Sequence, residues 1–554
     1  MKTKYYVYLF LANLLFFSCD LSNGEGKSDS GKDFIVSHDA SNIEKAIRDS
    51  IITSISREKE ISQKTARKYH NIELLDKVYG KNDYYRLWSS SDALHPRADS
   101  FYSMIQFAAY YGLFSEDYHF QQLKGLITDL RKEENQQNVS YWAKADLLLS
   151  DAFISFAHDL HLGRIPRDAE TLNPDTVVTA DFYLSLFKKM MDSMPRLTLE
   201  DLEPKHKAYQ SLRNALPIFV GGMNTKKYTY IRFPKKDSIS FVKELRQRLY
   251  EDGFIAFNDR MPDSIELAQA VRLAQKSLGI TIDGKPGPKF VRRINETDID
   301  RFRRIAINLD RYKHLPDQMP DAYIFVNLPA FKLQVIEDEN LVIESKVIVG
   351  KSTTRTPLLH SEISSLVTYP QWTVPRSIIF NEMIPKIKQD LAYLKRQNLM
   401  IVDKSDSVID PSSVNWSEMG GGNFPYVIRQ RQGDDNSLGV MKFNFPNSYS
   451  VYLHDTNARS LFGRENRALS HGCVRVQAWD TLARYIVSRD SSGVSVENLQ
   501  DWLTKQEKHN IPVKRKLPVY LRYFTAEVGE NGAIKFYDDI YGEDNKLIIK
   551  YFIR

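Results

Sequence analysis

The sequence predicts a mixed α+β protein built from three folded parts, and three observations support this. The chain has 554 residues, which is more than one compact domain usually holds. Apolar residues follow a helical spacing in the first half of the chain and alternate with polar residues after Tyr323. Hydrophobic residues at 42% and charged residues at 26% are typical of globular domains. The net charge of +6 is spread along the chain, so we expect no nucleic-acid partner.

The first residues have the features of an export signal. Two lysines precede a short apolar stretch that ends at Cys19 and is too short to span a membrane comfortably. The run that follows, up to Asp33, contains Leu21 as its one large apolar residue. We therefore expect a lipoprotein-type signal peptide at 1–19, lipidation of Cys19 as a membrane anchor, and a flexible tether at 20–39. The alternative is an ordinary secretory signal in which Cys19 is incidental.

Two helical regions are expected to follow the tether. In residues 40–237, apolar residues from Trp142 to Leu160 recur at intervals of three and four, and Gly163 then ends the helix. The aromatic residues of this region are expected to form its core. Residues 238–315 are expected to form a small unit of three helices, with a Gly- and Pro-rich turn at 279–287.

A strand-rich domain is expected at residues 320–545. Phe331, Leu333 and Val335 alternate with polar residues, and Asp338-Glu339-Asn340 then turns the chain into a second strand. Residues 380–435 interrupt the strands, first with a helical pattern and then with a Gly-rich stretch. A long insertion of this kind commonly covers a binding groove, although a surface excursion without a function is the alternative.

Cys473 is the main candidate for chemistry. Cys19 is the other cysteine of the chain, so an exported and lipidated protein would keep Cys473 as a free thiol. The alternation in the strand before it places Tyr452 and His454 on one face, opposite Val451 and Leu453. A cysteine needs a nearby imidazole at neutral pH, because the thiolate is the nucleophile.

Three readings of these residues are possible. Cys473 could be a buried structural residue, but this would not explain the two histidines or Gly472 beside it. A zinc site could use His454, His471 and Cys473, but a fourth ligand with a suitable spacing is missing. Nucleophilic catalysis by a Cys–His pair explains the whole pattern.

The motif resembles the catalytic signature of the L,D-transpeptidases. His454 is followed by a gap of fifteen residues and then by Ser470-His471-Gly472-Cys473-Val474-Arg475. Further segments at 323–332, 349–351, 356–357, 369–374 and 438–446 are similar to the same family. The helical region resembles the scaffold domain of its large periplasmic members. The turn at 279–287 resembles that of a peptidoglycan-binding-like module, with either a glycan-binding or a purely structural role.

The resemblance implies an enzyme without a cofactor or metal that acts on peptidoglycan peptide stems. Cys473 would attack the third-residue carbonyl of a tetrapeptide stem, release D-Ala and pass the acyl group to an acceptor amine, which gives a 3→3 crosslink. His454 would be the general base and acid. The backbone N–H groups of Gly472 and Cys473 would bind the oxyanion, supplemented by Tyr452, and the backbone carbonyl of Asp455 would orient His454.

The resemblance implies supporting roles for five more residues, namely Tyr452, Ser470, His471, Arg475 and Trp372. Arg475 could bind a substrate carboxylate or brace its loop. Trp372 could line the groove or belong to the core. Acylation of Cys473 by carbapenems is also implied.

The resemblance places the protein in the periplasm of a Gram-negative-type envelope, held there by its lipid anchor. Hydrolysis of the same acyl-enzyme, as in an L,D-carboxypeptidase, or attachment of a protein to the wall are alternative outcomes. A non-catalytic wall-binding scaffold is the rival from another class. The retention of both His454 and Cys473 argues against that rival.

Overall fold

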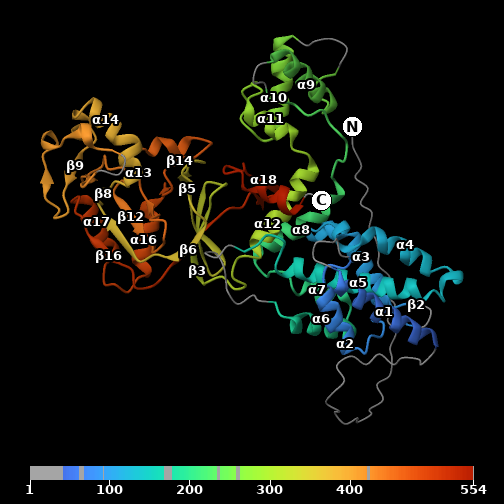
Figure 1. Cartoon of the computed structure of the whole chain (residues 1–554). Helices are drawn as coiled ribbons and strands as arrows, with labels where there is room; N and C mark the ends of the chain where they lie inside the picture. The colour runs from blue at the N-terminus through green and yellow to red at the C-terminus, as the bar shows by residue number, and fades with distance from the viewer. Residues whose placement is uncertain are drawn as a thin grey trace, which may run out of the picture.

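The computed structural model describes residues 42–61, 68–90, 93–167, 178–233, 237–256, 263–420 and 424–552. The expected signal peptide, the lipidation site Cys19 and the tether lie outside these residues. Figure 1 shows a large helical part, a small helical unit and a strand-rich part, so the class is α+β as predicted. Within the described ranges, the helices lack the combination of length and apolarity that a membrane span requires.

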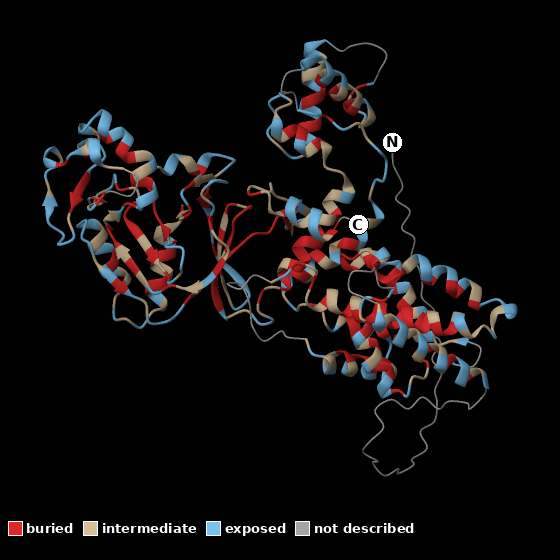
Figure 2. Ribbon diagram, viewed as in Figure 1, coloured by how far each residue is buried: buried red, intermediate tan, exposed pale blue. Residues whose placement is uncertain are grey.

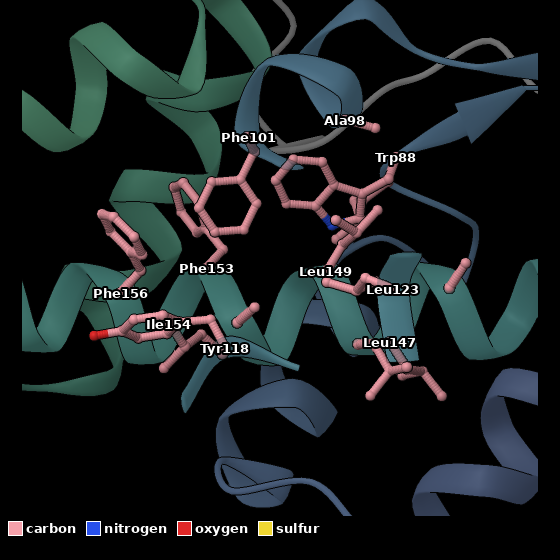
Figure 3. Close-up of a cluster of buried hydrophobic side chains, with 14 of the residues drawn as sticks. Trp88, Ala98, Phe101, Tyr118, Leu123, Leu147, Leu149, Phe153, Ile154 and Phe156 are labelled. Atoms are coloured by element: carbon pink, nitrogen blue, oxygen red, sulfur yellow. The ribbon is translucent and has the colours of Figure 1, made fainter. Parts of the chain in front are cut away.

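The large helical part is built around α5 (Val139–His161), which is buried along most of its length. This confirms the helical period predicted between Trp142 and Leu160. Figure 3 shows the ring of Trp88 beside those of Phe101 and Phe153, with ring centroids 5.4 and 5.8 Å from that of Trp88. The other helices of this part are α1 (Asn42–Glu60), α2 (Ile72–Lys81), α3 (Pro96–Gln106), α4 (Phe120–Leu130), α6 (Ala180–Asp192), α7 (Pro195–Glu200) and α8 (Lys207–Gly221).

A buried carboxylate ties α5 to the chain before α3. Asp146 on α5 accepts hydrogen bonds from the Tyr79 hydroxyl at 2.6 Å and from the backbone N–H groups of Leu87 and Trp88, each at 2.9 Å. Burial raises the pKa of Asp146, while these three donors favour its charged form. One side chain thus satisfies three buried donors that have to be paired inside the helical core.

The small unit contains α9 (Ser238–Glu251), α10 (Ser264–Ser277) and α11 (Pro288–Asn295). Leu245, Val271 and Phe290 come from different helices and belong to one core of its own. Asp237 and Asp263 accept hydrogen bonds from the first backbone N–H groups of α9 and α10, which fixes where these helices begin. The domain limits 40–237, 238–315 and 320–545 stay predictions.

The next helix packs away from this unit. We expected the apolar stripe of α12 (Asp298–Tyr312) to be part of the 238–315 unit, but Phe302, Ile305 and Leu309 share a core with α8 and with Phe524. The helix after the turn at 279–287 is α11 instead. The stripe of α12 is wide enough to need a large apolar partner, which α8 and the C-terminal segment provide.

An 11-stranded sheet system forms the strand-rich part, with the order β16-β7-β12-β13-β15-β5-β4-β3-β17-β6 and with β14 beside β5. The predicted hairpin is confirmed, since β4 pairs with β5 and Asp338 and Glu339 adopt positive φ angles at the turn. The strands of the sheet system are β3 (Ala322–Asn327), β4 (Lys332–Glu337), β5 (Asn340–Gly350), β6 (Leu359–Glu362), β7 (Ser365–Thr368), β12 (Met441–Asn444), β13 (Leu453–His454), β14 (Ala468–Ser470), β15 (Val474–Val476), β16 (Asn510–Pro512) and β17 (Pro518–Arg522).

The insertion folds into a unit with its own core. Its sheet has the order β10-β9-β11-β8, and residues such as Ile379, Ile401 and Ile428 are buried between this sheet and the short helices. In Figure 1 it lies at the outer end of the strand-rich part. Its elements are β8 (Trp372–Thr373), α13 (Arg376–Ile378), a π-helical turn (Ile379–Met383), α14 (Ile384–Gln389), α15 (Ala392–Arg396), β9 (Leu399–Val402), β10 (Val408–Ile409) and β11 (Val427–Gln430).

The C-terminal elements complete the strand-rich part and return to the helical part. Figure 2 shows buried residues inside each of the three parts, so each part has an interior of its own. Arg311 on α12 forms an ion pair with Asp544 at 2.7 Å. These elements are α16 (Trp479–Arg489), α17 (Val496–Thr504), β18 (Ala526–Val528), β19 (Ile534–Phe536), α18 (Glu543–Leu547) and a second π-helical turn (Ile548–Phe552).

We predict that Asp146→Leu destabilises the large helical part. The substitution removes the acceptor of two buried backbone N–H groups and one of the two hydrogen-bond partners of the Tyr79 hydroxyl. The free energy of unfolding should therefore fall by about 3 kcal/mol or more. The measurement is the thermal unfolding midpoint, with Asp201→Ala as the control. Asp201 is exposed and its ion pair with Lys205 is long, so its loss should change little. Equal midpoints for the two variants would contradict the role given to Asp146.

Candidate active site

Three neighbouring strands bring a row of polar residues to one face of the sheet. His454 on β13 lies directly opposite Lys442 on β12 and opposite Arg475 on β15. Residues that are paired in this way on adjacent strands point to the same face. The next pairs along the strands, which include Leu453 and Val474, are buried in the core on the other face. The alternation predicted around His454 therefore continues across three strands.

Tyr452 lies between this row and the thiol of Cys473. Its ring meets that of His454 edge to face at 5.6 Å between centroids, and the Nζ of Lys442 lies 4.0 Å from the ring centroid of Tyr452. The side chains of Cys473 and Trp372 lie near the Tyr452 hydroxyl, and burial, followed by the Cys473 sulfur, raises the pKa of Tyr452. Its backbone carbonyl accepts from the N–H of Val474 at 3.1 Å, which holds the two segments side by side.

The Ser470–Cys473 loop is held by hydrogen bonds within itself and to the segment after β5. The Ser470 hydroxyl donates to the carbonyl of Cys473 at 2.6 Å and accepts from the Gly472 N–H at 3.1 Å. The carbonyl of Gly472 accepts from the Thr356 hydroxyl at 2.7 Å. Gly472 has φ +121°, which a residue with a side chain rarely adopts. The loop therefore needs glycine at this position.

The backbone N–H of Gly472, which we expect to be an oxyanion donor, donates to the Ser470 hydroxyl in this structure. Ser470 accordingly has a structural role in shaping the loop.

His471 and Asp455 are directed to other partners. The Nε2 of His471 lies 2.6 Å from a carboxylate oxygen of Glu382, in the π-helical turn of the insertion. The carboxylate of Asp455 accepts from the Val440 N–H at 3.1 Å and from the guanidinium of Arg459 at 2.7 Å. His471 thus connects the catalytic loop to the insertion, and Asp455 connects β13 to the chain before β12.

Burial has the largest effect on the pKa values of His454 and Cys473. Burial, together with the positive charge of Arg475, lowers the pKa of His454 to about 3. The backbone of Asp455 favours the protonated ring, although the Nδ1 of His454 is buried without a partner at full hydrogen-bond geometry. Burial raises the pKa of Cys473, against the opposing effects of Tyr452, Lys442 and Arg475. The imidazole of His454 is therefore neutral at neutral pH.

Sequence reasoning missed Lys442. This half-buried residue lies between the buried residues Met441 and Phe443 on β12. A single lysine between two apolar residues in a strand was a signal that could have marked it, because its side chain has to point to the face opposite the core. Its nearness to Cys473, however, depends on the pairing of β12 with β13.

Known proteins support this description of the strand-rich part. The family model described as an L,D-transpeptidase catalytic domain matches residues 321–496, and that of a Scaffold domain matches residues 73–216. A Haemophilus influenzae protein named as a candidate L,D-transpeptidase is 39% identical over 260 residues, which cover 47% of this chain and 51% of the relative. The chain thus spans about half the length of this curated relative.

Solved structures are similar only at a low level. A crystal structure of an L,D-transpeptidase from Stackebrandtia nassauensis is 15% identical, covers 54% of this chain and 97% of that chain, and gives a TM-score of 0.16. A mutant of the Enterococcus faecium L,D-transpeptidase is 12% identical, covers 38% and 52%, and gives 0.18. Scores this low add nothing to the assignment. From the match at residues 321–496 we conclude that this chain contains an L,D-transpeptidase catalytic domain, which follows a Scaffold domain at residues 73–216.

Proposed function

We propose that the protein is a peptidoglycan L,D-transpeptidase with Cys473 as its nucleophile. The observation that carries this proposal is the contact of the Cys473 thiol with Tyr452, next to His454 and within the matched catalytic domain. A thiol, a neutral imidazole and a hydroxyl donor are the groups that acyl transfer from an amide requires. The substrate places the reaction in the cell envelope, where the lipid on Cys19 would hold the enzyme.

The first half-reaction forms a thioester. Cys473 loses its proton to His454, and the sulfur attacks the carbonyl carbon of the third stem residue. The tetrahedral intermediate collapses with cleavage of the C–N bond, and the D-Ala amine leaves with the proton from the imidazolium of His454. The backbone carbonyl of Asp455 would orient the ring. Because the Gly472 N–H is engaged by Ser470, the oxyanion would use the N–H of Cys473 and the Tyr452 hydroxyl.

The second half-reaction transfers the acyl group. An amine of a neighbouring stem attacks the thioester, its proton passes to His454, and the sulfur of Cys473 leaves as the thiolate. The new amide is a 3→3 crosslink. Water as the acceptor would make the enzyme a carboxypeptidase or hydrolase, and the acyl-enzyme would be the same.

The remaining residues and parts would position the substrate. The Trp372 side chain, which belongs to the insertion sheet and contacts Tyr452, would line the groove for the stem. The insertion, joined to the catalytic loop by the His471–Glu382 contact, would cap that groove. Helices α9–α11 would form the peptidoglycan-binding-like module.

We predict that the protein releases D-Ala from tetrapeptide-stem muropeptides and forms 3→3 dimers. In Cys473→Ala, D-Ala release should fall below about one thousandth of the wild-type rate, because the nucleophile is gone. Both products are measured by mass spectrometry, with Lys395→Gln, an exposed change on α15, as the control. Release of D-Ala without dimers would assign a carboxypeptidase, and product from Cys473→Ala would refute the nucleophile.

We predict that the reactivity of Cys473 increases steadily with pH. Since the pKa of the thiol is raised and that of His454 is about 3, His454 is neutral above pH 5 and provides no imidazolium to stabilise a thiolate. The thiolate fraction should therefore increase about tenfold per pH unit between pH 6 and 8. The measurement is the rate of iodoacetamide alkylation at Cys473, followed by peptide mass spectrometry with N-acetylcysteine as the reference. A plateau below pH 7 would show an imidazolium–thiolate pair instead.

A further inference from the structure

Two positive side chains lie beside the thiol, and among the residues that the structure describes neither forms an ion pair with a carboxylate. For both Lys442 and Arg475, the attractive charge interaction is with Cys473, and both also lower the pKa of His454. Burial lowers the pKa of each, and the Nε of Arg475 is buried without a hydrogen-bond partner. Charges that are partly removed from water are costly unless an opposite charge compensates them, so this arrangement favours the binding of an anion.

The two cations are fixed on either side of His454. Lys442 and Arg475 are both paired with His454, from β12 and β15 respectively, so all three share the face on which Tyr452 meets the thiol. The Nζ of Lys442 rests above the Tyr452 ring, and the hydroxyl of that ring contacts Cys473. A cation over an aromatic ring is held in place without a carboxylate. The positive charge beside the sulfur is therefore built into the sheet.

The thiolate of Cys473 can be the anion for only part of the reaction. Once the sulfur is acylated it carries no charge, and two half-buried cations would face a neutral thioester. A bound carboxylate would compensate them in that state. The C-terminal carboxylate of a peptide stem leaves with D-Ala when the thioester forms. Where the third residue is a diamino acid such as diaminopimelate, its side-chain carboxylate stays in the acyl-enzyme.

We propose that Lys442 and Arg475 form an anion-binding pair that stabilises the Cys473 thiolate and selects acyl donors by a carboxylate of the stem. The selection of a stem carboxylate rests on the proposed function. The stabilisation of the thiolate does not, because it concerns the unacylated sulfur and needs no substrate. Lys442 is thus a further residue of the site, in addition to those that the motif contains.

The charge at the sulfur is tested with two alkylating agents on the full chain. In both reactions the thiolate displaces iodide and forms a C–S bond, but iodoacetate is an anion and iodoacetamide is neutral. We expect the ratio of the iodoacetate rate to the iodoacetamide rate at Cys473 to fall at least about fivefold in Lys442→Gln. Lys442→Arg keeps the charge and should stay within about twofold of the wild type. Lys395→Gln removes an exposed lysine on α15 and should leave the ratio unchanged.

The choice of donor is tested with three stems. The C-terminal carboxylate is absent in a tetrapeptide amide, and the side-chain carboxylate is absent when lysine replaces diaminopimelate as the third residue. For each stem that lacks one carboxylate, we compare its kcat/KM for release of the fourth residue with that of the stem that has both carboxylates. The ratio of the two values should move toward one in Lys442→Gln for the carboxylate that the pair binds. The stem whose ratio changes therefore identifies that carboxylate.

The outcomes separate this inference from the proposed function. An unchanged alkylation ratio in a folded Lys442→Gln, with the wild-type melting temperature, would overturn the anion-binding pair. If the alkylation ratio falls in Lys442→Gln as expected but the wild type uses all three stems equally, the selection of a carboxylate would be overturned. If the wild type releases nothing from any stem, the proposed function fails, and the alkylation ratio still decides the role of Lys442.

Discussion

The register of three short strands determines the chemistry of this protein. β12, β13 and β15 are paired so that Lys442, His454 and Arg475 stand in one row, with Tyr452 and Cys473 beside them. A shift of one residue in either pairing would turn a member of this row into the core, because side chains alternate between the two faces of a strand. Buried residues such as Leu453 and Val474 on the opposite face make such a shift costly. The hydrophobic core thus fixes the positions of the polar residues.

The site combines a neutral imidazole with two positive side chains. Burial and the two cations that flank His454 lower the pKa of its ring, so the ring is neutral in the resting protein. The same cations oppose the effect of burial on Cys473. In the resting protein the imidazole is therefore neutral and does not form an ion pair with a thiolate. The positive charge beside the sulfur comes from Lys442 and Arg475, which do not have to transfer protons.

The insertion is physically connected to this site at two points. Trp372 reaches the hydroxyl of Tyr452 from the insertion sheet, and Glu382 contacts His471 next to Gly472. Each contact joins a residue of the insertion to a segment that holds the thiol. A change in the position of the insertion would therefore alter the surroundings of the Cys473 thiol.

Much of the architecture could be predicted because it depends on local patterns. The helical period around α5, the hairpin turn at Asp338 and Glu339, and the shared face of Tyr452 and His454 follow from residues close together in the chain. The packing of α12 on α8 and the position of Lys442 beside Tyr452 could not be predicted in the same way. The sequence alone determined which residues share a strand face and which cysteine and histidine belong together in a motif. Only the tertiary structure decided which strands are neighbours, because pairing joins residues that are distant in the chain and is set by the packing of the whole domain.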